Sequence, residues 1–271
     1  RVTMLAVHRR NEILDLIQKN QFISVRKLCS ILFYSEATIR RDLEQLEKDG
    51  AIIRIRGGAM IREGLNIELP LNLRQVNNIR QKNAIAAKAA ELIEDNDVLF
   101  FDTSSSVLSL LHHLDKFKNI TVITNSLQTG SALTELKNCK VYSTGGASFS
   151  KARQSLVGVH ARDYIRNFYA AKFFFSARSV SLKYGLTDSY EEEVEIKREM
   201  MNQSDMKILL ADSSKINQKS FYHVCDLSDI DIMITDPGST VTTPEWSQSI
   251  KKLVLCSPVI SPEHPPQNDI K

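Results

Sequence analysis

The sequence predicts an α/β protein in two parts, an N-terminal winged helix-turn-helix joined to a doubly wound, mostly parallel α/β domain. Three observations predict this fold class. Residues 1–64 show helical spacing of apolar residues followed by a basic hairpin. From residue 82 onward, short apolar runs alternate with helical patterns. Four of the ten glycines fall between residues 50 and 64, just before Pro70, which marks a domain boundary.

This boundary divides the chain into segments of different charge. We expect a winged helix-turn-helix over residues 1–64, a linker over 65–80, an α/β effector domain over 81–256 and a disordered tail over 257–271. Residues 1–64 hold 12 Lys and Arg against 8 Asp and Glu, whereas the remainder holds 23 against 24. The basic surplus lies in the small N-terminal part, which favours a polyanionic partner such as nucleic acid.

Composition excludes several classes of protein. With 42% apolar and 25% charged residues, 271 residues can bury a core. No apolar run reaches the roughly 18 residues of a membrane helix, and the N-terminus lacks the apolar region of a secretory signal, so we expect a cytoplasmic protein with no membrane contact. The four cysteines are far apart and the six histidines form no ligand pattern. The sequence therefore predicts free thiols, no metal and no cofactor.

Three helices are expected in the N-terminal part. Apolar spacing around residues 13–17 predicts the first. The second follows Ser24 as N-cap, and the third covers Glu36 to Lys48, with Ser35 as N-cap and Gly50 after its end. Helix, helix, short turn and helix is the order of a helix-turn-helix.

The third helix has an outward face suited to DNA. Ile39, Leu43 and Leu46 share one face, so the small, hydroxyl, amide and cationic side chains lie on the other. Arginine pairs with guanine and glutamine with adenine in the major groove. The residues expected at the DNA are Ser35, Thr38, Arg40, Arg41 and Gln45.

A basic hairpin follows this helix. The strand from Ala51 carries Arg54 and Arg56, Gly57-Gly58 forms the turn, and the return strand ends in Arg62. Such a wing contacts the phosphate backbone or the minor groove, so we assign Arg54, Arg56, Gly57 and Gly58 to the DNA interface. An ordinary solvated helix, or a winged helix that binds protein, is the alternative.

The second part predicts a parallel sheet with helices on both faces. Expected strands are 98–101, 120–123, 141–143, 173–177, 208–211 and 230–235, with residues 251–254 closing the sheet. Expected helices are 105–114, 127–136, 156–168 and 191–203. Ligands of such sheets bind at the carboxyl ends of the strands.

Small and polar residues follow several of these strands. Hydroxyls, free backbone N–H groups at helix starts and a lysine would converge there on an oxyanion, and Asp102 and Asn125 would hydrogen-bond sugar hydroxyls. We therefore expect a site for a small phosphorylated polyol. Its residues are Asp102, Thr103, Ser104, Ser105, Ser106, Thr124, Asn125, Gly145, Gly146 and Lys215.

The run from Ser35 to Leu43, containing T-I-R-R-D-L, and the R-G-G-A of residues 56–59 resemble the DNA-binding domain of DeoR-type bacterial transcriptional regulators. The resemblance continues to about Asp236, where Glu193 and Lys197 match family positions of the effector site. It implies a repressor of a carbohydrate operon that binds double-stranded operator DNA as a homodimer or homotetramer. It also implies an effector domain resembling ribose-5-phosphate isomerase and CoA transferase, with a phosphorylated sugar as effector.

Two positions depart from the family pattern. Where D-S-G-T-T is common, residues 102–106 read Asp-Thr-Ser-Ser-Ser, and where F-L-G-A is common, residues 174–177 read Phe-Phe-Ser-Ala. Each change places a side chain where glycine would let the backbone approach a ligand closely. We expect these positions to affect which effector binds.

An enzyme is the main alternative function. Carboxylates between Glu191 and Glu195, with Lys197, offer a base and a polarising cation for a phosphosugar isomerase fused to a winged helix. An acidic helix start is also what the helix dipole favours, so the pattern does not require catalysis. The sequence therefore predicts a regulator with no catalytic residues.

Overall fold

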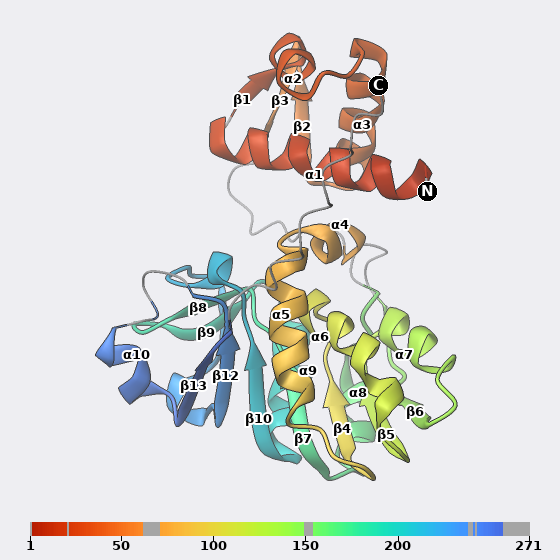
Figure 1. The fold of residues 1–271 in the computed structure, drawn as a ribbon, viewed down its shortest axis with the longest axis vertical. Coiled ribbons are helices and arrows are strands. Elements are labelled where there is room, and N and C mark those ends of the chain that lie inside the picture. The colour runs from red at the N-terminus through yellow and green to blue at the C-terminus, as the bar shows by residue number, and fades with distance from the viewer. Residues whose placement is uncertain are drawn as a thin grey trace, which may run out of the picture.

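The computed structural model describes residues 2–20, 22–61, 71–148, 154–237, 241 and 243–256. In Figure 1 a small, mainly helical domain at the N-terminus stands above a larger α/β domain. The expected N-terminal helix-turn-helix and parallel α/β sheet are both present. Arg62, Gly64, the first part of the linker and the tail over 257–271 lie outside the described residues.

The N-terminal domain contains three helices and three short strands. These are α1 Val2–Asn20, β1 Phe22–Ser24, α2 Val25–Leu32, α3 Glu36–Lys48, β2 Ile52–Ile55 and β3 Gly58–Ile61. The two expected N-caps are confirmed, because Ser24 Oγ accepts from Lys27 N and Ser35 Oγ accepts from Thr38 N. The wing is larger than expected: β1 pairs with β3 and gives an antiparallel sheet in the order β1-β3-β2.

An ion pair fixes α3 against α1. Arg9 donates from Nε and Nη2 to the two carboxylate oxygens of Asp42, and its guanidinium lies 4.8 Å from the centroid of the Tyr34 ring. Asp42 is buried, and its hydrogen bond raises the pKa of Arg9 above the ordinary value. Around this pair, apolar residues of all three helices form one core, including Ile13, Leu28 and Ile39.

Seven parallel strands form the sheet of the larger domain, in the order β13-β12-β10-β7-β4-β5-β6. They are β4 Val98–Phe101, β5 Ile120–Thr124, β6 Cys139–Ser143, β7 Ala170–Phe175, β10 Ser204–Leu210, β12 Ile232–Thr235 and β13 Lys252–Leu255. The expected closure of the sheet near residues 251–254 is confirmed by β13, which pairs with β12.

Helices cover both faces, as a doubly wound sheet requires. Those described are α4 Leu71–Val76, α5 Ile79–Ala90, α6 Ser105–Leu110, α7 Leu127–Leu133, α8 Val159–Ile165, α9 Glu191–Asn202 and α10 Pro244–Ser249. Along β4, Leu99 and Phe101 join the core beneath α5 and α6, whereas Phe100 joins the core beneath α8 and α9. The two cores therefore lie on opposite sides of one sheet.

A second, antiparallel sheet was not expected. It consists of β8 Ser179–Ser181, β9 Gly185–Asp188 and β11 Tyr222–Cys225, in the order β11-β9-β8. Three short 3₁₀ helices cover Leu111–Lys116, Ser213–Lys215 and Leu227–Asp229. The expected helix over 156–168 is shorter, because Gly158, with φ of 96°, precedes α8 and Arg166 ends it. The second half of the expected linker is helical, as α4 and the start of α5.

The ion pair between Arg9 and Asp42 gives a first prediction. Asp42→Asn leaves a guanidinium without its carboxylate in a mostly buried position, which costs about 3 kcal/mol. Amides of α1 and α3 are then expected to exchange with deuterium about a hundredfold faster. The control is Glu44→Gln, which breaks the exposed ion pair with Lys48. Its free energy of unfolding should change by no more than about 0.5 kcal/mol. Equal protection in both variants would show that the pair does not hold α3.

Candidate DNA-binding surface and effector cavity

The exposed face of α3 contains the side chains expected at DNA. Ile39, Leu43 and Leu46 are buried, whereas Arg40, Arg41 and Gln45 are exposed and Thr38 is half-buried. Thr38 Oγ1 lies 2.9 Å from Ser35 Oγ, so both hydroxyls lie at the start of the helix. The helix therefore presents cationic, amide and hydroxyl groups together.

The four arginines of this surface differ in their partners. Arg40 donates to Glu36 Oε1 at 2.6 and 2.9 Å, and Arg54 Nε donates to Glu47 Oε2 at 2.7 Å. The hydrogen bonds from Arg54 lower the pKa of Glu47. Arg41 and Arg56 form no ion pair with any described residue. Two guanidinium groups are thus oriented by carboxylates, and two are available for phosphate or bases.

The helix and the wing are joined by a groove. It is lined by Val25, Arg40, Leu43, Arg54, Ile55, Arg56, Gly57 and Gly58. Structural reasons also account for both glycines. Gly57 has φ of 87°, a conformation that L side chains rarely adopt, and a Cβ on Gly58 would meet the carbonyl oxygen of Ile23 in β1 at 2.4 Å. The R-G-G-A turn therefore shapes the wing, and its arginines supply the charge.

A second cluster lies at the carboxyl ends of the parallel strands. A narrow cavity of about 30 Å³ collects six of the expected effector residues, Asp102, Thr103, Ser104, Glu193, Lys197 and Lys215. Asp102 is the centre of this cluster. Its Oδ1 accepts from Ser104 N at 2.9 Å and its Oδ2 accepts from Ser176 N at 3.0 Å. The carboxylate that follows β4 thereby fixes the loops after β4 and β7.

The acid and the lysine that α9 contributes to the narrow cavity both have defined partners. Lys197 Nζ donates to Asp188 Oδ2 and lies 3.8 Å from Asp102 Oδ2. Burial alone would lower the pKa of Lys197, but the carboxylates outweigh it and the pKa is raised. Glu193 accepts from Thr103 Oγ1 at 3.1 Å and from Ser155 Oγ at 2.7 Å. These contacts hold the acid and the lysine of α9 in place.

The serine that departs from the family pattern contacts Lys215. Lys215 Nζ donates to Ser176 Oγ at 3.1 Å and to the carbonyl oxygen of Ala177 at 3.0 Å. Burial lowers the pKa of Lys215, and neighbouring cations lower it further. A glycine at position 176 has no hydroxyl for this contact. The other departure, Ser104, is the N-cap of α6 with φ of −81°, so no glycine is required there.

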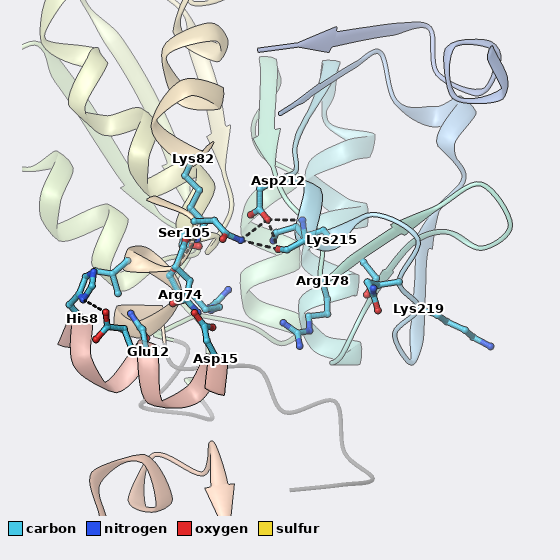
Figure 2. A pocket seen from close by; sticks show the side chains of 17 residues that line it. His8, Glu12, Asp15, Arg74, Lys82, Ser105, Arg178, Asp212, Lys215 and Lys219 are labelled. Carbon is cyan, nitrogen blue, oxygen red and sulfur yellow. Dashed lines mark hydrogen bonds and ion pairs between the residues drawn. The ribbon is translucent and has the colours of Figure 1, made fainter. Parts of the chain in front are cut away.

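A larger cavity of about 480 Å³ adjoins the narrow one and shares Arg74, Arg178 and Lys215 with it. Figure 2 shows Lys82, Asp212 and Lys215 grouped on one side of it, with Arg74 between them and α1. Lys82 and Lys219 add further positive charge. From the expected set, Ser105 also lines this cavity.

A network of hydrogen bonds organises the same region. Asn78 Nδ2 donates to Asp212 Oδ1 at 3.0 Å and to Ser214 Oγ at 3.1 Å. Lys82 Nζ donates to the carbonyl oxygens of Arg74 and Asn77. Burial would raise the pKa of Asp212, but Lys215, the Ser214 hydrogen bonds and Lys82 outweigh it and lower the pKa. Burial lowers the pKa of Lys82 to about 8, although Asp212 partly opposes the change.

Five expected effector residues line neither cavity: Ser106, Thr124, Asn125, Gly145 and Gly146. Ser106 is fully buried, Thr124 Oγ1 accepts from Ser126 N, and Asn125 Nδ2 donates to the carbonyl oxygen of Leu156. Gly146 packs so closely on Val157 that a Cβ would lie 2.6 Å from its carbonyl oxygen. Thr124, Asn125 and Gly146 thus belong to the packing of the loops after β5 and β6, whereas Ser106 lies inside α6.

The expected effector set left out five residues that line the cavities, Arg74, Lys82, Arg178, Asp188 and Asp212, although Arg74, Lys82 and Asp212 lie in segments that match the family pattern. Arg74 and Lys82 precede the first strand of the sheet, so a search of strand ends alone does not find them. Asp212 lies two residues after the end of β10, in the same polar run as Lys215. Among the described residues, no cluster of His, Cys, Asp and Glu could hold a metal, and no helix is long and apolar enough to cross a membrane.

Known proteins resemble this chain in both parts. Residues 9–64 match the DeoR-like helix-turn-helix domain family, and residues 77–237 match the DeoR C terminal sensor domain family. The HTH-type transcriptional repressor GlcR of Bacillus subtilis is 34% identical, over 83% of this chain and 86% of that protein. The HTH-type transcriptional regulator GolR of Listeria innocua is also 34% identical, over 86% and 91%.

Among solved structures, the ribose 5-phosphate isomerase of Plasmodium falciparum is similar with a TM-score of 0.36 and 17% identity. The match covers 50% of this chain and 52% of that one. Similarity at this level says nothing about activity.

The altered pKa of Lys82 is testable. We expect its ε-carbon NMR signal to titrate with a midpoint near pH 8, well below the ordinary value of 10.5. Asp212→Asn removes the carboxylate that favours the charged ammonium, so the midpoint should fall further. Because the pKa of folded Lys82 lies below its unfolded value, the folded state should gain stability as pH rises from about 8 to 10.5. A midpoint near 10.5 in both proteins would contradict the burial of this lysine.

Proposed function

Because the chain belongs to the DeoR family of HTH-type transcriptional regulators, we propose that it represses an operon of carbohydrate metabolism under the control of a phosphorylated sugar. The N-terminal domain binds operator DNA. The sugar binds at the carboxyl ends of the parallel strands and changes the affinity for that DNA. The homologues are named as regulators and repressors, so the chain is a regulator and not an enzyme.

The surface of α3 and the wing supports the DNA-binding half. Arg41 and Gln45 lie on the exposed face of α3, which is the face that enters the major groove; Gln45 Nε2 donates to Asp49 Oδ1 at 2.8 Å and would exchange this partner for a base. Arg56, at the tip of the wing, is placed for the phosphate backbone. Symmetric operators favour a protein that binds them as a homodimer or homotetramer. Binding to operator DNA places the protein in the cytoplasm.

The observation that carries the effector half is the excess of cations around the larger cavity. Its lining includes five Lys and Arg side chains against three carboxylates. At about 480 Å³ it lies within the range of small-molecule sites, whereas the narrow cavity of about 30 Å³ holds little more than a water molecule. Charge-assisted hydrogen bonds to phosphate suit the Lys and Arg groups, and no cofactor is needed.

Arg41→Ala tests the DNA half. Loss of a direct contact should weaken binding to the operator by roughly 1–3 kcal/mol, a factor of about 5 to 150. The measurement is fluorescence anisotropy at fixed salt, on duplex from upstream of the protein's own gene and on scrambled duplex. Arg166→Ala, which removes an exposed arginine of the α/β domain, serves as control. If Arg41→Ala binds the native duplex as tightly as the unaltered protein, α3 is not the recognition helix.

Lys215→Ala tests the effector half. Lys215 lines both cavities, so its loss should abolish the change that a sugar phosphate causes in operator affinity. The readout is the ratio of operator affinities with and without the ligand. Lys183→Ala, which removes an exposed lysine outside both cavities, should leave this ratio unchanged. A full response in Lys215→Ala would remove this lysine from the site.

A further inference from the structure

The larger cavity has two walls that belong to different domains. One wall comes from the α/β domain and includes Arg74, Lys82, Arg178, Lys215 and Lys219. The other comes from α1 of the winged helix and consists of His8, Asn11, Glu12 and Asp15. In Figure 2, Glu12 and Asp15 of α1 lie on the side of Arg74 opposite to Lys82 and Lys215. A ligand in this cavity therefore touches the DNA-binding domain directly.

The two walls differ in chemistry. The wall from the α/β domain is cationic and suits a phosphate group. The wall from α1 contains carboxylates and an amide. In the same wall, His8 Nδ1 lies 3.6 Å from Glu12 Oε1. Carboxylate oxygens accept hydrogen bonds from hydroxyl groups but repel phosphate. The uncharged part of a sugar phosphate thus matches the wall from α1.

Asn11 gives independent support for a ligand on this side. Its side chain is only 6% exposed, and neither Nδ2 nor Oδ1 has a hydrogen-bond partner among the described residues. Buried amide groups in folded proteins are nearly always paired, since an unpaired one costs roughly 1–3 kcal/mol. The amide carries a donor and an acceptor, and a sugar hydroxyl carries both as well. Asn11 lines the cavity, and its two amide atoms are covered, so a rotation of its side chain would bring them to a bound polyol.

We propose that α1 forms half of the effector site: the phosphate lies against the cationic wall, and the sugar hydroxyls bond to Asn11 and Glu12. This inference rests on the proposed function and adds which residues recognise the sugar. Inorganic phosphate would contact one wall only. A sugar phosphate contacts both, so it binds more tightly when α1 is docked and shifts the protein toward that arrangement. The sugar part, and not the phosphate, then carries the signal to the DNA-binding domain.

The test is calorimetry of the full-length chain with inorganic phosphate, glycerol 3-phosphate, glucose 6-phosphate and fructose 6-phosphate. At least one of the three phosphate esters should bind more tightly than inorganic phosphate. Asn11→Ala should weaken that ester by roughly 5- to 15-fold, the size of one hydrogen bond, and leave inorganic phosphate unchanged. Glu12→Gln should weaken the same ester in the same selective way.

The control is Asn20→Ala, which removes an exposed asparagine of the same helix outside the cavity. It should alter neither affinity. The melting temperature without ligand separates recognition from a structural role. Removal of an unpaired amide should leave it equal or raise it, whereas loss of a structural contact would lower it. Glu12, which is half-buried, provides the same comparison if Asn11→Ala does not fold.

Each remaining outcome is decisive. If all three esters bind no more tightly than inorganic phosphate, or if Asn11→Ala and Glu12→Gln keep the preference for the ester, α1 does not recognise the sugar. The anion site of the proposed function would then stand without the contribution of α1. If neither inorganic phosphate nor any ester binds the unaltered protein, the proposed effector site fails, and the role of α1 fails with it.

Discussion

Seven strands run in the same direction, and this shared polarity decides where the polar chemistry of the α/β domain can lie. Both faces of the sheet are covered by apolar cores, so the polar groups of the two cavities gather at the ends of the strands. The carboxyl ends bring Asp102, Ser176 and Asp212 to one edge, although they are far apart in sequence. The proposed effector site and its proposed contact with α1 both depend on this arrangement.

At this edge, the two cavities differ in their balance of charge. In the narrow cavity Lys197 pairs with Asp188, and Glu193 accepts hydrogen bonds from two hydroxyls. The larger cavity above it has more cations than carboxylates. An excess of cations in the larger cavity suits a site that binds an anion. The carbohydrate effector, its site and the contact with α1 are proposals that build on this geometry.

The sequence was most informative where local rules act. Ser24 and Ser35 cap their helices, and the spacing of Ile39, Leu43 and Leu46 correctly separates the buried face of α3 from the exposed one. The order of the seven parallel strands depends on tertiary pairing between distant segments. The small sheet of β8, β9 and β11 and the third strand of the wing also depend on it, and their strands are only three or four residues long. Thr124 and Asn125 stay predictions for the effector site, and in the structure Thr124 Oγ1 accepts from Ser126 N while Asn125 Nδ2 donates to the carbonyl oxygen of Leu156. Arg178 and Asn11 carry no local signal and gain their positions only through the fold.

Thermodynamic linkage tests the central claim most directly, because coupling between two sites must be equal in both directions. Operator affinity of the full-length chain is measured with and without a saturating sugar phosphate, and affinity for that sugar phosphate is measured with and without saturating operator duplex. We predict that the sugar phosphate changes operator affinity by some factor, and that operator changes the affinity for the sugar phosphate by the same factor. The contrary result is a sugar phosphate that binds with the same affinity whether or not operator is present, and that leaves operator affinity unchanged. That result would show that the two sites are not coupled.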